Sequence, residues 1–90
     1  IAPAGGGELD GELFERLRAL RRSLADAEGV PAYIVFSDAV LRAMAAAHPH
    51  DEAALLRVSG VGPAKLARYG EAFLRLLRDH RSDEGRRTAR

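Results

Sequence analysis

Residues 59–65 read Ser-Gly-Val-Gly-Pro-Ala-Lys and force the chain to reverse between two segments of helical pattern. Gly60 can take the left-handed conformation that ends a helix, because it has no Cβ to clash. Gly62 is an acceptable N-cap, and Pro63 suits the first position of the next helix, where no N–H donor is needed. We therefore predict a helix-hairpin-helix-like turn with Val61 buried between the two helices.

A first long helix is predicted upstream of this turn. Asp10 is a good N-cap, across which Leu9 and Phe14 are placed to form a hydrophobic staple. Gly29 is expected to end the helix. Its apolar stripe consists of Leu13, Leu17, Leu20 and Leu24, spaced by four, three and four residues.

Residues 30–36, Val-Pro-Ala-Tyr-Ile-Val-Phe, are rich in β-branched and aromatic types and by themselves predict a strand. No other segment could pair with it, and a lone strand is not a stable element. We therefore expect an extended or 3₁₀ connector. Alternation along it would bury Ile34 and Phe36 and leave Tyr33 partly exposed.

Four further helices are predicted after the connector, each carrying apolar residues at helical spacing. The expected bounds are Ser37 or Asp38 to before Pro49, residues 51–58, residues 63–69 closed by Gly70, and Glu71 to about His80. The fold class is therefore all-α, a compact five-helix bundle. We expect a flexible Gly/Ala/Pro-rich linker at residues 1–8, a helical domain at 9–80 and a mobile polar tail at 81–90.

The composition fits one small domain of 90 residues, 47% of them hydrophobic. The absence of cysteine excludes disulfides and thiolate metal sites and is typical of a reducing cytoplasm. No apolar run is long enough to span a bilayer, so no membrane partner is expected. The net charge of +1 excludes a uniformly basic surface, so nucleic acid would need a local basic patch.

No residue set predicts catalysis, because no nucleophile–base pair and no nucleotide-binding P-loop sequence is present. His48, His50 and Asp51 are close enough in sequence to suggest a metal site. No further His or Cys stands at metal-site spacing, and Pro49 indicates an exposed loop. We favour a surface loop with a helix cap, and expect neither a catalytic residue, nor a metal, nor a cofactor in this chain.

Two segments are candidate binding sites. The backbone N–H groups of the hairpin, including those of Gly60 and Gly62, could bind a phosphate oxygen with charge added by Lys65, the only lysine. The alternative is a sharp turn that binds nothing. Tyr33 could stack on single-stranded bases, or it could be buried along its ring with its hydroxyl in water. Arg21, Arg22 and Arg42 could complete a basic rim around it, although exposed arginines usually serve solubility.

Three blocks of the sequence resemble the helicase-and-ribonuclease-D C-terminal (HRDC) domain. They are Leu-Phe-Glu-Arg-Leu-Arg at 13–18, Gly-Val-Pro-Ala-Tyr-Ile-Val-Phe-Ser-Asp at 29–38, and Gly-Val-Gly-Pro-Ala-Lys-Leu at 60–66, with Tyr69 and Gly70 before Phe73. The resemblance runs from about Leu9 to His80, and the second block looks closest to bacterial RecQ-type DNA helicases.

The resemblance implies a five-helix accessory domain appended to a helicase or exonuclease core. In DNA-binding members an aromatic residue at the place of Tyr33 contacts DNA, and that role carries over directly to Tyr33. It extends to Arg21, Arg22 and Lys65 only by proximity. DNA-binding members tend to be more basic than this nearly neutral chain, which leaves room for a role in protein docking.

We accordingly predict a non-catalytic domain of a RecQ-like ATP-dependent DNA helicase that acts in DNA repair and recombination. It would bind single-stranded or junction DNA and tune substrate choice, as a monomer in the bacterial cytoplasm near the nucleoid. ATP and Mg²⁺ would belong to the parent's motor domain. The alternatives are a docking module for the helicase core or a repair partner, and an RNA-binding domain of a ribonuclease D.

Overall fold

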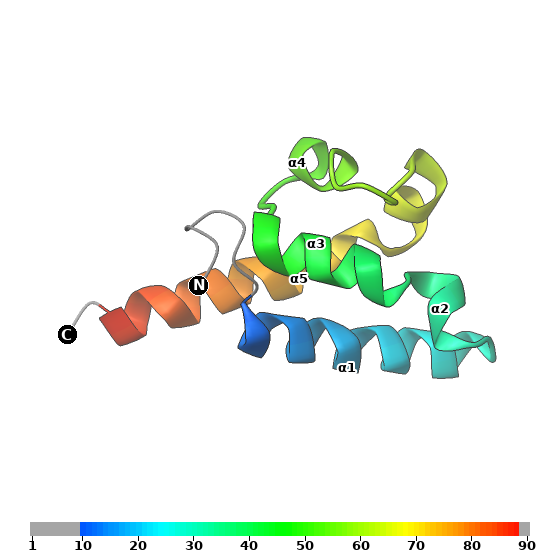
Figure 1. Ribbon diagram of the computed structural model, residues 1–90, viewed down its shortest axis with the longest axis horizontal. Helices are drawn as coiled ribbons and strands as arrows, with labels where there is room; N and C mark the ends of the chain where they lie inside the picture. Colours follow the sequence, from blue (N-terminus) through cyan, green and yellow to red (C-terminus); the bar gives the residue numbers. More distant parts are fainter. Residues whose placement is uncertain (1–9, 89–90) are drawn as a thin grey trace, which may run out of the picture.

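The computed structural model describes residues 10–88 as an all-α fold, which confirms the predicted class. Leu9 and the predicted linker lie outside the described residues. The helices are α1 (Gly11–Glu28), α2 (Ala32–Val35), α3 (Asp38–Ala47), α4 (Glu52–Leu56) and α5 (Pro63–Thr88) (Figure 1). None of these helices is long and apolar enough to cross a membrane.

The three longer helices enclose the core, and the two short ones connect them. In Figure 1, α1 lies along one edge, α3 runs above it, and α4 lies on the far side of α3. Helix α5 packs against both α1 and α4 and continues past the start of α1. The one-turn helix α2 packs on α1 and joins it to α3.

Side-chain caps explain where α1, α3 and α4 begin. Asp10 accepts a hydrogen bond from Leu13 N at 3.1 Å, as its predicted N-cap role requires. Ser37 caps α3, and Asp51 caps α4 by accepting from Ala54 N at 2.8 Å. Gly29 ends α1 in the left-handed conformation with φ of 70°, as predicted.

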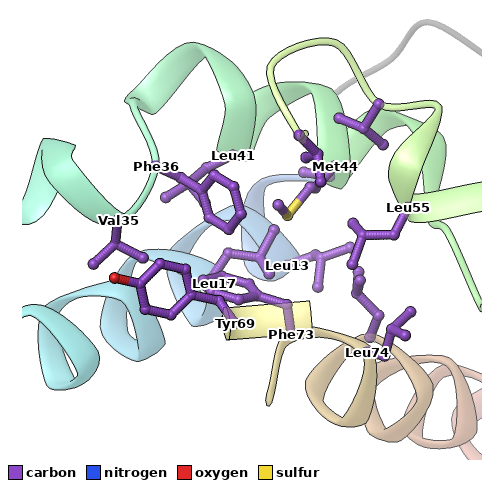
Figure 2. Packing of buried hydrophobic residues seen from close by; sticks show 14 of the residues in the cluster. Leu13, Leu17, Val35, Phe36, Leu41, Met44, Leu55, Tyr69, Phe73 and Leu74 are labelled. Atoms are coloured by element: carbon purple, nitrogen blue, oxygen red, sulfur yellow. The ribbon is translucent and has the colours of Figure 1, made fainter. Parts of the chain in front are cut away.

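The core is a cluster of leucines around three aromatic rings (Figure 2). Phe36 packs edge-on against Tyr69 and Phe73, with ring centroids 6.0 and 5.1 Å apart. Leu13 and Leu17 from the predicted α1 stripe are fully buried in this cluster, while Leu20 and Leu24 are partly buried. The connector thus inserts its last aromatic residue between α1 and α5.

The connector itself differs from the expectation of an alternating segment. Pro31 and Phe36 have extended backbones, but residues between them form the helical turn α2. Phe36 is buried as predicted, whereas Ile34 is 42% exposed and Val35 takes the buried position. A helix rotates each residue by about 100° and a strand by about 180°, so the inward-facing residue moves by one position.

The predicted break at Gly70 and the predicted helix end near His80 are wrong, because α5 is continuous over 26 residues. Gly70 is buried inside α5, and a Cβ there would meet Leu66 Cδ1 at 2.8 Å. The Leu66 side chain belongs to the preceding turn of α5, and the helix continues through Gly70 instead of ending there. Five helices were predicted and residues 10–88 contain five, but α5 joins two predicted helices and α2 replaces part of the connector.

Candidate nucleic-acid interface

Helix α2 presents Tyr33 to solvent. The Tyr33 side chain is 67% exposed, and the adjacent Ile34 is 42% exposed. Val35, two positions after Tyr33, is fully buried. The one-turn helix thus has an apolar inner side on the core and an outer side that carries an accessible aromatic ring.

Two cations satisfy the last carbonyl groups of this segment. Lys65 Nζ on α5 donates to Ile34 O at 2.6 Å and to Val35 O at 2.9 Å. The same ammonium lies 5.5 Å from the centroid of the Phe36 ring. Arg21 Nη1 on α1 donates to Phe36 O at 3.0 Å. The structure thus brings Lys65 and Arg21 to the backbone of α2, from two different helices.

Arg21 also forms an ion pair with Asp38 at the first position of α3, at 2.7 Å. The hydrogen bond from Arg21 and its positive charge lower the pKa of the Asp38 carboxyl. Arg21 is only 9% exposed, although Asp38 is solvent-accessible. This pair fixes the join between α2 and α3.

A groove of about 460 Å³ lies between α1 and the start of the connector. Its charged lining comes from α1 and consists of Glu15, Arg18, Arg21, Arg22 and Asp26. Val30, Pro31 and Ala32 close its other side. Arg22 is exposed in this groove, so the groove places an available guanidinium next to the segment that carries Tyr33.

Arg42 is an exposed residue of α3 that contacts Phe14 of α1. Its guanidinium carbon is 5.7 Å from the centroid of the Phe14 ring, and that of Arg18 is 5.8 Å from the same ring. The Phe14 ring is thus within cation–π distance of an arginine from α1 and of one from α3. The three arginines predicted to form one rim are therefore in different settings: Arg22 is exposed in the groove, Arg42 contacts Phe14, and Arg21 is buried.

The glycine hairpin has the predicted backbone. Gly60 has a φ of 94°, and Val61 is buried. Leu66 N donates to Gly62 O at 2.9 Å, as expected for an N-cap residue. The Val61 N–H donates a hydrogen bond to Val58 O at 3.0 Å, so this N–H is not available to a ligand. The Lys65 ammonium lies at α2, where its partners are the two carbonyl groups already described.

A polar cluster that the sequence did not predict lies at the other end of α1. Fully buried His80 has its Nε2 3.1 Å from Asp10 Oδ2, and its Nδ1 3.0 Å from Arg16 Nη1. Glu84 Oε2 is 3.6 Å from His80 Nε2, and His48 Nε2 is 3.4 Å from Asp10 Oδ2. Burial would raise the pKa of Asp10, but hydrogen bonds from Leu13 N and His80 lower it overall.

Asp10, His80 and Glu84 are close enough together to suggest a metal site. Arginine is always protonated, so Arg16 must donate and His80 Nδ1 must accept. The imidazole proton is therefore on Nε2, where it is donated to Asp10. This tautomer leaves no lone pair on Nε2 for a metal, and the cluster is explained as a buried network that caps α1. In the sequence, Asp10 was recognised only as a cap and His80 only as a helix end.

The histidines of the Pro49 loop have separate partners. His48 faces Asp10, whereas His50 contacts Arg81 and its carbonyl oxygen accepts from Arg78 Nε at 2.9 Å. Burial, followed by the charge of Arg81, lowers the pKa of His50. Asp51 caps α4, as the sequence predicted. The three residues therefore do not converge on one point.

The profile of the HRDC domain family matches residues 10–77, which includes α1 to α4 and the first half of α5. The chain belongs to the HRDC domain family. This finding confirms the resemblance seen in the sequence. The HRDC profile covers Tyr33, the α2 segment and the hairpin, so all predicted site residues lie inside the family match.

Relatives of this HRDC domain include bacterial DNA helicases. It is 44% identical over 78 residues to the ATP-dependent DNA helicase RecQ of Haemophilus influenzae, covering 87% of this chain and 13% of the helicase. It is 48% identical over 63 residues to RecQ of Bacillus subtilis, covering 70% of this chain and 11% of that helicase. It is 44% identical over 71 residues to the ATP-dependent DNA helicase UvrD2 of Mycobacterium tuberculosis, covering 79% of this chain and 10% of that helicase.

A solved structure agrees with these relatives. The third HRDC domain of D. radiodurans RecQ superposes with a TM-score of 0.72 at 40% identity, and covers 74% of this chain and 88% of that domain. The chain thus corresponds to nearly all of one HRDC domain but to about an eighth or less of the helicases it resembles.

Proposed function

We propose that this HRDC domain is a DNA-binding accessory module of a RecQ-like ATP-dependent DNA helicase that acts in DNA repair and recombination. It contacts single-stranded or branched DNA and tunes which DNA structure the parent engages. The observation that carries the proposal is the 67% exposure of Tyr33 on a short helix whose other side is anchored in the core. An exposed ring of this kind is a stacking surface for an unpaired base.

The groove next to α2 supports the same proposal. Arg18 and Arg22 are exposed side chains of α1 that line it, and both can reach phosphate oxygens that follow a stacked base. Glu15 and Asp26 line the same groove, so the local charge is only moderately positive. We therefore expect weak binding that depends strongly on salt.

The helicase parent is inferred from the relatives. The RecQ and UvrD2 proteins are both named ATP-dependent DNA helicases, which favours a helicase over a ribonuclease D. ATP hydrolysis and Mg²⁺ binding would then belong to the motor domain of the parent. Sequencing the gene on either side of this segment tests this point, because an exonuclease domain in place of a motor would contradict it.

DNA binding is tested by titrating the domain with single-stranded and junction oligonucleotides at several salt concentrations. The logarithm of the association constant should fall linearly with the logarithm of salt, by about 0.7 for each phosphate contacted on a single strand. A duplex of the same length serves as the comparison. Affinity that is unmeasurable at low salt, or that does not change with salt, would contradict the proposal.

A second candidate function is docking on the helicase core or on a repair protein. It is favoured by the exposure of Ile34 beside Tyr33 and by the net charge of only +1. Chemical-shift mapping separates the two functions. Shifts at α2 on addition of DNA favour the first, and shifts only on addition of the helicase core favour the second.

A further inference from the structure

We propose that Lys65 and Arg21 are positioning residues for Tyr33, which hold α2 in its helical turn, and do not themselves contact the phosphate backbone. The inference rests on the proposed function, since it assigns roles within the same interface. Both residues were candidates for direct DNA contact from the sequence. Their hydrogen bonds in the folded domain point to a different role.

Helix α2 cannot be stable by its own local interactions. It has four residues, and its N-cap, Pro31, makes no side-chain hydrogen bond. Isolated helices shorter than about 12–15 residues are marginal in water, and the last carbonyl groups of any helix lack partners within it. The helical turn must therefore be held by groups from elsewhere in the fold.

Lys65 and Arg21 supply those groups. Lys65 donates to Ile34 O and Val35 O, at 2.6 and 2.9 Å, and Arg21 donates to Phe36 O at 3.0 Å. Three consecutive carbonyl oxygens are thus satisfied by two cations. A positive charge is also favourable at the C-terminal end of a helix, where the peptide dipoles place partial negative charge.

Both cations are committed to these partners. Two of the three Lys65 donors are used, and its ammonium also faces the Phe36 ring at 5.5 Å. Arg21 is 9% exposed and is paired with Asp38 at 2.7 Å. Arg22, the next residue, is exposed and forms no hydrogen bond or ion pair with any described residue, so it is the better candidate for a phosphate contact.

The direction of Tyr33 depends on this arrangement. A helical turn places Val35 in the core and leaves Tyr33 and Ile34 in solvent. An extended segment would also expose Tyr33 but would bury Ile34 in place of Val35, which would change the orientation of the ring and its neighbours. Loss of the Lys65 hydrogen bonds should let the segment sample other conformations. The exposed ring would then be ordered only on binding, which costs affinity without removing a phosphate contact.

The first experiment uses the free domain and needs no DNA. Lys65→Met keeps the aliphatic stem and removes the donors, while Arg75→Met removes the same charge from an exposed position of α5 that forms no hydrogen bond or ion pair with the described residues. We expect the Ile34 amide, which donates to Pro31 O at 3.0 Å, to exchange with solvent about tenfold faster in Lys65→Met. The exchange rates of core amides in α1 and α5 should change much less in Lys65→Met. Arg75→Met should leave the exchange rate of the Ile34 amide unchanged.

The second experiment measures single-stranded DNA affinity against salt. Lys65→Met should weaken binding by about 3–10-fold with an unchanged salt slope, whereas Arg22→Met should reduce the slope by about 0.7. In a Tyr33→Ala background, Lys65→Met should cause no further loss, because its effect passes through the ring. Should Lys65→Met not fold, Lys65→Gln separates the two roles, because it keeps N–H donors without the charge. A positioning role predicts that the Ile34 amide stays protected and the salt slope stays unchanged, whereas a phosphate contact predicts a slope lower by about 0.7.

Three results would contradict the positioning role or show that the proposed DNA-binding function itself is wrong. An Ile34 amide that exchanges equally fast in Lys65→Met and in the unmodified domain would show that Lys65 does not hold α2. A salt slope reduced by about 0.7 in Lys65→Met would show that Lys65 contacts phosphate. A domain that binds no DNA at all would overturn the proposed function and with it the positioning role, while the exchange data would still report whether α2 is held.

Discussion

The phenolic hydroxyl of Tyr69 on α5 donates a hydrogen bond of 2.8 Å to Glu28 Oε1 in the last turn of α1. The other carboxylate oxygen of Glu28 accepts from Arg68 Nε at 3.1 Å. Tyr69 packs its ring against Phe36 at the same time, so one side chain joins the core to the end of α1. The hydrogen bonds from Arg68 and then from Tyr69 lower the pKa of Glu28, while burial raises the pKa of Tyr69.

The lowered pKa of Glu28 makes this contact sensitive to acid. A carboxyl group with a folded-state pKa below its ordinary value of 4.5 stabilises the fold fully above that pH. The contribution is lost as the pH falls from there through the lower folded-state value. We predict that the free energy of unfolding falls less steeply with acid in Glu28→Gln than in the unmodified domain. Urea unfolding at a series of pH values measures this.

Glu71→Gln is the matched control for that experiment, since Glu71 is exposed on α5 and forms no hydrogen bond or ion pair with the described residues. Its acid profile should follow that of the unmodified domain. Equal profiles for Glu28→Gln and the unmodified domain would mean that the ionised Glu28 contact adds no stability.

The hairpin offers a comparison between two glycines. Gly60 has a φ of 94°, and a Cβ at this position would clash with Val40 Cγ2. Gly62 has no atom within 4 Å of an added Cβ and no positive φ. Gly60→Ala should therefore lower the free energy of unfolding by about 1–3 kcal/mol, and Gly62→Ala should be near neutral. Thermal and urea unfolding compare the two, and equal losses would contradict the assigned backbone roles.

The buried His80 network should contribute measurably to stability. His80→Leu keeps an apolar volume but leaves Arg16 and Asp10 without the partner that joins them. Hydrogen bonds to charged groups are worth about 1.5–3 kcal/mol, so we expect a loss of that order in urea unfolding. His50→Leu, at a half-buried position of the loop, should change stability by about 0.5 kcal/mol or less. Comparable losses in the two variants would rule out a special role for the network.

The stacking role of Tyr33 can be separated from its hydroxyl group. Tyr33→Ala should weaken single-stranded DNA binding by about 1–3 kcal/mol, and Tyr33→Phe should retain most of the affinity because the ring remains. Since the side chain is 67% exposed, neither change should lower thermal stability greatly. Fluorescence anisotropy with a labelled oligonucleotide gives both affinities. Unchanged affinity in Tyr33→Ala would remove Tyr33 from the interface.

Most helix starts could be predicted from local chemistry. Asp10, Ser37 and Asp51 cap helices where the sequence indicated, because a side-chain oxygen that accepts a backbone N–H within three residues acts locally. The conformations of Gly29 and Gly60 were also predictable, because only glycine adopts positive φ without a Cβ clash. The fold class followed from helical periodicity.

Gly70 shows where this reasoning failed. The sequence could not distinguish a glycine that ends a helix from a buried glycine inside one, since glycine is tolerated at both positions. The extension of α5 beyond His80 was missed for a different reason. Its contacts with α1 are made by His80 and Asp83 with Arg16, which are polar pairs more than 60 residues apart. Apolar periodicity carries no information about such pairs.

Local sequence alone determined the all-α class, most caps, the hairpin and the candidacy of Tyr33, because each depends on residues within a few positions of one another. Only the tertiary structure decided which of Ile34 and Val35 is buried and where Lys65 and Arg21 direct their charges. Those outcomes depend on carbonyl groups of α2 meeting cations from α1 and α5, 15 to 31 residues away in the chain. Contacts of that range exist only once the helices have packed.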